Sequence, residues 1–137
     1  MANKFITLLM AELEPWTGLL RYLNAGHNPG YLVRANGRVE ELSSSGLPLG
    51  LLPNSRYQPR ELVVEPGDIV CFYSDGITEA ESIDEQEFGT ERLIELLRRH
   101  QGFTLQEVLE TLQGAVTRFA VGKPQYDDQT VVLLRRE

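Results

Sequence analysis

Short turn signals between apolar runs constrain the fold of this chain more than any other feature. Up to Tyr73 the apolar runs come in pairs, and each pair is joined by a few residues rich in Pro, Gly, Asn or Asp. Parallel neighbours in a sheet need a crossover of about a dozen residues or more, so these connections predict antiparallel pairing. The expected pairs are FITLLMAEL with LLRYLNA, YLVRA with RVEEL, and ELVV with IVCFY.

The turns between these pairs are clear in the sequence. Residues 14–18 read EPWTG, and residues 65–68 read EPGD. The Asn36-Gly37 pair separates YLVRA from RVEEL, and it favours a type I′ turn, whose twist matches that of the flanking strands. We therefore expect three antiparallel hairpins before residue 74.

After Gly76 the apolar pattern changes to the spacing of a helix. From Thr104 onward apolar residues recur on one helical face, and Thr104 with Glu107 forms a capping box. A shorter helix is predicted at residues 90–99 and a last strand at residues 129–134. Strands followed by helices and a final strand predict an α+β fold, with helices packed on antiparallel sheet.

Composition narrows the class of protein. The length of 137 residues suits one domain, residues 1–137. With 13 basic and 20 acidic residues the net charge is −7, so we expect neither nucleic acid nor an anionic membrane as a partner. We found no apolar run of membrane-spanning length and no signal-peptide pattern, and we expect a cytoplasmic protein. The single cysteine, Cys71, lies among apolar residues and is expected to be a buried thiol.

Carboxylates stand at the boundaries of two apolar strands. Asp75 follows IVCFY directly after Ser74, and the Asp127-Asp128 pair precedes the last strand. Two such strand ends, if brought together, would offer oxygen ligands to Mg²⁺ or Mn²⁺, and Gly76 would let the backbone approach a ligand closely. The alternative is that these aspartates serve only as turn or cap residues.

Five motifs follow one another in a characteristic order along nearly the whole chain. They are NAGHNP at residues 24–29, GLPLG at 46–50, GD at 67–68 leading to YSDGITEA at 73–80, FGTERL at 88–93, and DDQT at 127–130. This series resembles the SpoIIE-like and RsbU-like serine/threonine phosphatases, the bacterial branch of the PPM family of metal-dependent protein phosphatases.

The resemblance implies a sandwich of two antiparallel sheets flanked by helices. It also implies two divalent cations, Mn²⁺ or Mg²⁺, which activate a water for hydrolysis of phosphoserine or phosphothreonine. By motif match Asp75 and Asp127 are metal ligands, Asp128 ranks after them, and Gly76 shapes the ligand turn. The expected substrate is a phosphorylated signalling protein such as an anti-sigma-factor antagonist.

Two residues of the first motif have supporting roles under this resemblance. Asn24 and His27 are expected to tie their own loop by hydrogen bonds. His27 is also considered as a general acid, but a structural role within the turn is favoured.

The sequence departs from the family pattern in one respect. Members of the family have an upstream segment like Gly-Asp-Val-Ser-Gly-His-Gly whose aspartate bridges the metals, and this sequence contains no such segment. We therefore expect a partial domain, truncated on its N-terminal side, with weak or single-cation binding and impaired or absent activity. Uncovered strand edges would favour a homo-oligomer. The alternatives are a non-catalytic module that binds a phosphoprotein or dimerises, and a structural domain whose aspartates only cap turns.

Overall fold

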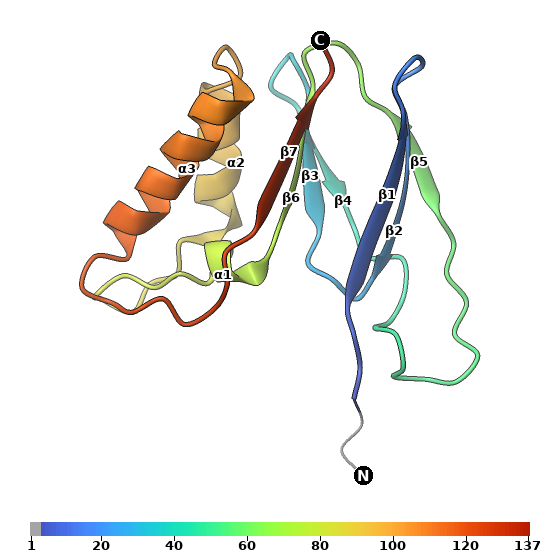
Figure 1. Ribbon diagram of the computed structural model, residues 1–137, viewed down its shortest axis with the longest axis horizontal. Coiled ribbons are helices and arrows are strands. Elements are labelled where there is room, and N and C mark those ends of the chain that lie inside the picture. The colour runs from blue at the N-terminus through green and yellow to red at the C-terminus, as the bar shows by residue number, and fades with distance from the viewer. Residues whose placement is uncertain (1–3) are drawn as a thin grey trace.

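The structure, a computed structural model, describes residues 4–137, and these form two antiparallel sheets with helices on one side (Figure 1). The elements follow one another as β1 (Leu8–Glu14), β2 (Leu19–Ala25), β3 (Gly30–Val33), β4 (Val39–Leu42), β5 (Arg60–Val63), β6 (Ile69–Tyr73), α1 (Asp75–Thr78), α2 (Gly89–Arg99), α3 (Leu105–Phe119) and β7 (Val131–Arg135). Within this range no helix is both long and apolar enough to cross a bilayer.

The two sheets lie face to face. One has the strand order β1-β2-β5 and the other β4-β3-β6-β7, and all neighbouring strands are antiparallel. Helices α2 and α3 cover the outer face of the four-stranded sheet, where α2 contacts β3 and α3 contacts β7 (Figure 1). The α+β sandwich flanked by helices, expected from the turns and from the resemblance, is therefore confirmed.

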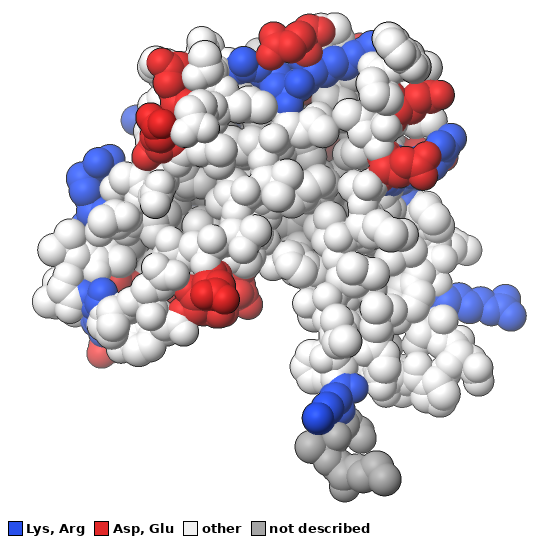
Figure 2. Space-filling view, in the orientation of Figure 1, with Lys and Arg blue, Asp and Glu red and all other residues white. Residues whose placement is uncertain are grey.

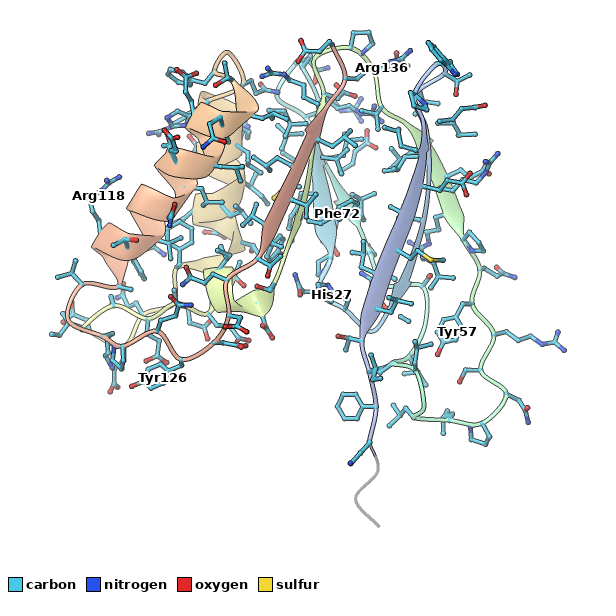
Figure 3. The ribbon with its side chains drawn as sticks, in the orientation of Figure 1. His27, Tyr57, Phe72, Arg118, Tyr126 and Arg136 are labelled. Carbon is cyan, nitrogen blue, oxygen red and sulfur yellow. The ribbon has the colours of Figure 1, made fainter. Side chains whose placement is uncertain are left out.

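Apolar residues fill two layers of core, one on each face of the four-stranded sheet. The layer between the sheets consists of Leu20, Tyr22, Leu32, Leu42, Val64 and Val70, with Phe72 beside it (Figure 3). The layer under the helices joins Tyr31, Val33, Cys71 and Tyr73 to Leu93, Leu97, Val108, Leu112 and Val116. Cys71 is fully buried, as expected, and burial raises the pKa of its thiol to about 12. Successive side chains of β6 point to opposite faces of the sheet, so this strand contributes residues to both layers.

The first two expected hairpins are confirmed, but the third is wrong. Strand β5 pairs with β2, whereas β6 pairs with β3 and β7 in the other sheet. The reason lies in Asp68, whose buried carboxylate accepts hydrogen bonds from the amides of Glu65 and Ala35, both at 2.9 Å, and from the guanidinium of Arg34 at 2.8 Å. The turn is bonded to the end of β3, so the chain passes from one sheet to the other.

The turn between β3 and β4 is also not of type I′. The amide of Gly37 donates to the carbonyl of Arg34 at 2.8 Å, and the amide of Arg34 donates to the carbonyl of Arg38 at 2.8 Å. Gly37 has a φ of 85°, whereas Asn36 is not among the residues with positive φ. A type I′ turn needs positive φ at both central residues, so this is a three-residue loop that ends in a glycine bulge.

The helical predictions hold with small shifts at the ends. Helix α3 begins with the expected capping box, in which the Glu107 amide donates to the Thr104 hydroxyl and the Thr104 amide donates to the Glu107 carboxylate. These bonds hold the pKa of Glu107 below its usual value. Helix α1, a single turn, was not expected. The last strand begins at Val131 rather than at residue 129, because residues 127–130 approach the end of β6 in irregular conformation.

The two ends of the sandwich differ in construction. At the end where the chain terminates, the guanidinium of Arg136 donates to the carbonyls of Trp16, Thr17 and Val64 at 3.2, 3.1 and 2.9 Å (Figure 3). These bonds join β7 to the β1–β2 turn in the opposite sheet. Helix α1 and the β2–β3 loop lie at the other end (Figure 1). We call this second end the α1 end.

Candidate metal centre

The site begins where β6 ends, at Ser74. Its amide donates to the carbonyl of Thr130 at 2.9 Å, and its hydroxyl accepts from the amide of Thr130 at 2.9 Å and donates to the carbonyl of Asp128 at 3.0 Å. Ser74 occupies the N-cap position of α1 but makes no side-chain cap bond there. Its hydroxyl instead fastens the end of β6 to the segment that enters β7.

Gly76 brings the predicted ligand residues together. A Cβ atom at this position would overlap the carbonyl oxygen of Asp128 and would lie 3.3 Å from that of Asp127. The Asp75-Gly76 backbone therefore lies directly against the backbone of Asp127-Asp128. All three aspartates are exposed, so their carboxylates are free to meet solvent or a cation. The three aspartates, which come from two motifs far apart in the sequence, thus lie together in the fold.

The electrostatics of this place involve a carboxylate that the sequence reading did not select. The pKa of Glu79 is raised, first because of partial desolvation and then because of the negative charges of Asp75, Glu87 and Asp127. Glu79 lies one helical turn after Asp75, and its amide donates to the Asp75 carbonyl at 2.8 Å. Figure 2 shows acidic side chains gathered over α1 and the segment before β7. The four-residue spacing between Asp75 and Glu79, typical of neighbours on one helical face, was the signal available in the sequence.

Glu79→Gln is expected to stabilise the protein slightly at neutral pH when no divalent cation is present. A carboxyl whose pKa is raised by folding disfavours the folded state above that raised pKa, and this effect is absent below the ordinary value of 4.5. The gain in melting temperature should therefore vanish in acid and shrink at ~1 M salt, where the Debye length is about 3 Å. Thermal unfolding of both proteins at several pH values measures this. An equal gain at all pH values would contradict it.

The residues present fit one hydrated cation better than a two-ion centre. The donors are carboxylate oxygens, which suit Mg²⁺ and Mn²⁺. Within residues 4–137 there is, however, no group of three or more His, Cys, Asp or Glu side chains arranged to hold a metal. Mg²⁺ usually keeps several waters and is bound through only one or two carboxylates, and Asp75 with Asp127 could provide these.

A pocket of about 610 Å³ lies beside these carboxylates. Gly76, Glu79 and Asp127 line one part of it, and Val116, Thr117 and residues 120–126, at and after the end of α3, line the other. On its rim the ammonium group of Lys123 lies 3.5 Å from the carboxylate of Glu81. Pockets of this size commonly hold small ligands or side chains of a partner. The arrangement can therefore place a group of a substrate next to the acidic residues.

Asn24 and His27 lie in the loop between β2 and β3, and they tie this loop as expected. Asn24 is fully buried, and its side chain accepts from the His27 amide at 2.8 Å and donates to the Asn28 carbonyl at 3.3 Å. The ring Nδ1 of His27 donates to the same carbonyl at 2.9 Å. Figure 3 shows His27 at the α1 end, between the two sheets. Within the described part of the chain, no hydrogen bond joins His27 to the three aspartates.

Comparison with known proteins gives a consistent picture. The family model described as Stage II sporulation protein E (SpoIIE) matches residues 1–137. Protein IcfG of Synechocystis is 32% identical over 133 residues, which are 96% of this chain and 21% of IcfG. Phosphoserine phosphatase RsbU of Bacillus subtilis is 30% identical over 139 residues, covering 99% of this chain and 40% of RsbU. The chain thus spans less than half the length of these relatives.

Solved structures share the fold. A Mycobacterium tuberculosis protein with RsbU and RsbW domains superposes with a TM-score of 0.80 at 23% identity, covering 98% of this chain and 37% of that one. The SiaA-PP2C domain of Pseudomonas aeruginosa gives a TM-score of 0.76 at 24% identity, covering 88% and 48%. The manganese-presoaked phosphatase domain of SpoIIE from Bacillus subtilis gives 0.65 at 23% identity, covering 94% and 56%.

Proposed function

The chain belongs to the SpoIIE family, as a SpoIIE/RsbU-type domain of the PPM phosphatases, and we propose that it forms part of a metal-dependent protein serine/threonine phosphatase in bacterial signalling. The observation that supports this most is the junction of β6 with β7, where Gly76 packs Asp75 against Asp127-Asp128. We also propose that residues 1–137 are one partial domain, because they cover only 48% and 56% of two solved phosphatase domains.

In this proposal the aspartates hold the cation, and the packed backbones at the ends of β6 and β7 hold the aspartates in place. Asp75 and Asp127 would bind one Mn²⁺ or Mg²⁺, with Asp128 as a further oxygen donor. When bound, the cation would supply Lewis-acid chemistry, since it lowers the pKa of water and offsets negative charge on the phosphoryl oxygens. Ser74 prevents the two strand ends from separating. The neighbouring pocket provides space for the phosphorylated segment of the substrate.

The substrate we propose is a phosphorylated signalling protein, such as an anti-sigma-factor antagonist, which would place the reaction in the cytoplasm. The relative RsbU is named a phosphoserine phosphatase, and this supports phosphoserine as the residue that is hydrolysed. The Mycobacterium tuberculosis neighbour carries an RsbW domain together with its RsbU domain, and this supports a partner in the same kind of signalling system.

A second candidate function is a module that binds a phosphoprotein or dimerises without hydrolysis. Within residues 4–137 no group of three or more His, Cys, Asp or Glu side chains is arranged to hold a metal, and this favours it. Strands β1 and β7 are edge strands of their sheets in the described chain, and they expose Met10 and Val132. Exposed edges of this kind readily pair with another chain. The same aspartates would then bind a cation weakly or serve only as turn residues.

Hydrolysis of a phosphoserine peptide by the purified chain tests the proposal. We expect release of phosphate with Mn²⁺ at an impaired rate, because the chain is proposed to be a partial domain, none with chelator, and none from Asp75→Asn at any cation concentration. Asp84→Asn is a matched control, because Asp84 is an exposed aspartate of the 81–87 loop. Folded protein that releases no phosphate with Mn²⁺ would favour the non-catalytic module. Release that continues with chelator or in Asp75→Asn would contradict the proposal.

A further inference from the structure

The register between β3 and β6 leaves a carbonyl at the end of β6 without its usual donor. Tyr31 lies opposite Cys71 and Leu32 opposite Val70, and the same register continued by two residues puts Pro29 opposite Tyr73. Since Ser74 pairs with the β7 side, the polar groups of Tyr73 point to the β3 side. Proline has no N–H, so Pro29 cannot donate to the carbonyl of Tyr73.

The side chain of Asn28 replaces the missing backbone donor. Its Nδ2 donates to the carbonyl of Tyr73 at 2.8 Å. Asn28 is held in turn, because its own carbonyl accepts from the side chain of Asn24 at 3.3 Å and from the ring of His27 at 2.9 Å. Asn24 is fully buried and cannot move without disturbing the core. The end of β6 is thus bonded to a rigid loop.

The residues before Asp75 are therefore held from both sides. Asn28 holds Tyr73 from the β3 side, and the next residue, Ser74, is held from the β7 side by its bonds to residues 128 and 130. Asp75 follows immediately as the first residue of α1, and its main-chain position is set by these two attachments. A loop that contributes no carboxylate can in this way determine where the carboxylate of Asp75 lies.

We propose that Asn28 is a positioning residue that sets the place of Asp75 for cation binding. This rests on the proposed function, since a cation at Asp75 is part of it. Partners that orient metal ligands from outside the coordination sphere typically change metal affinity by 10–100-fold when they are removed. Asn28→Ala removes the donor without adding charge, and it leaves all three aspartates in place.

Two measurements test the positioning role, one of them without metal. The amide of Ile77 donates to the Ser74 carbonyl and that of Glu79 to the Asp75 carbonyl, so their hydrogen exchange reports the order of this segment. In metal-free Asn28→Ala we expect exchange about tenfold faster at these amides, with little change in the helices that pack on the sheet. With Mn²⁺ we expect binding about tenfold weaker than in the wild type.

Asn36→Ala is the matched control, because Asn36 lies beyond the other end of β3 and, among residues 4–137, its side chain accepts only a local bond from the Arg38 amide. The positioning role would be overturned if the Ile77 and Glu79 amides exchanged at the same rate in both variants. It would also be overturned if exchange in Asn28→Ala rose by the same factor along the whole chain. If Asn28→Ala does not fold, Asn28→Ser is measured in the same way. A wild type that binds no Mn²⁺ would overturn the proposed function, while the metal-free exchange still decides the role of Asn28.

Discussion

Asp68→Ala is expected to lower the free energy of unfolding by about 3 kcal/mol. The carboxylate of Asp68 is buried, and it accepts from the Arg34 guanidinium and from the amides of Ala35 and Glu65. Alanine would leave three donors without their acceptor at the point where the chain changes sheets. Domains of this kind are usually stable by only about 5–15 kcal/mol, so the loss is a large share. Urea unfolding followed by circular dichroism measures it.

Glu61→Ala is the control for this prediction, because it removes a carboxylate from an exposed ion pair. The Nε of Arg21 lies 2.7 Å from the Glu61 carboxylate, and both side chains are about half exposed. Pairs of this kind contribute about 1 kcal/mol or less. If the two variants lost a similar amount of unfolding free energy, the buried hydrogen bonds of Asp68 would not be what holds the chain where it changes sheets.

Gly76→Ala is expected to reduce stability by about 1–3 kcal/mol and to weaken cation binding at the same time. The added methyl group would collide with the backbone carbonyl of Asp128, which cannot rotate away as a flexible side chain could. Relief requires that α1 and the segment before β7 move apart, and this separates Asp75 from Asp127. Urea unfolding and Mn²⁺ titration of the same sample measure the two effects.

Gly102→Ala is the matched control, since a Cβ at this position would meet no atom within 4 Å in the described chain beyond Gly102 and its two sequence neighbours, and its backbone does not have positive φ. We expect this variant to change neither stability nor cation binding appreciably. If Gly76→Ala behaved like Gly102→Ala, the close packing of the two strand ends would not be needed for the site.

Local sequence signals predicted the strands and helices well, because each is determined by nearby residues. Strand β6 was expected at its observed bounds, and the capping box of α3 was read from Thr104 and Glu107. The pairing of β5 failed, because ELVV and IVCFY lie close in sequence whereas the contacts of Asp68 to residues 34 and 35 are distant in sequence. Turn chemistry around residues 65–68 alone could not reveal that the chain changes sheets there.

For the candidate site the sequence identified the aspartates but not what holds them. Asp75, Asp127 and Asp128 were chosen from motifs, and their placement beside one another agrees with that choice, although their role as ligands stays a prediction. Asn28 was seen only as part of a motif, because its function depends on the register that puts Pro29 opposite Tyr73. Glu79 was missed because only the folded chain places it near the charge of Asp127.

We propose above all that the joined ends of β6 and β7 bind a divalent cation through Asp75 and Asp127. Isothermal titration calorimetry with Mn²⁺ tests it on the wild type, on Asp75→Asn and Asp127→Asn, and on Asp84→Asn as a control. We expect weak binding of one ion in the wild type and in the control, and loss of binding in both site variants while circular dichroism shows them folded. No heat of binding at millimolar Mn²⁺ in the wild type, or equal binding in all four proteins, would contradict it.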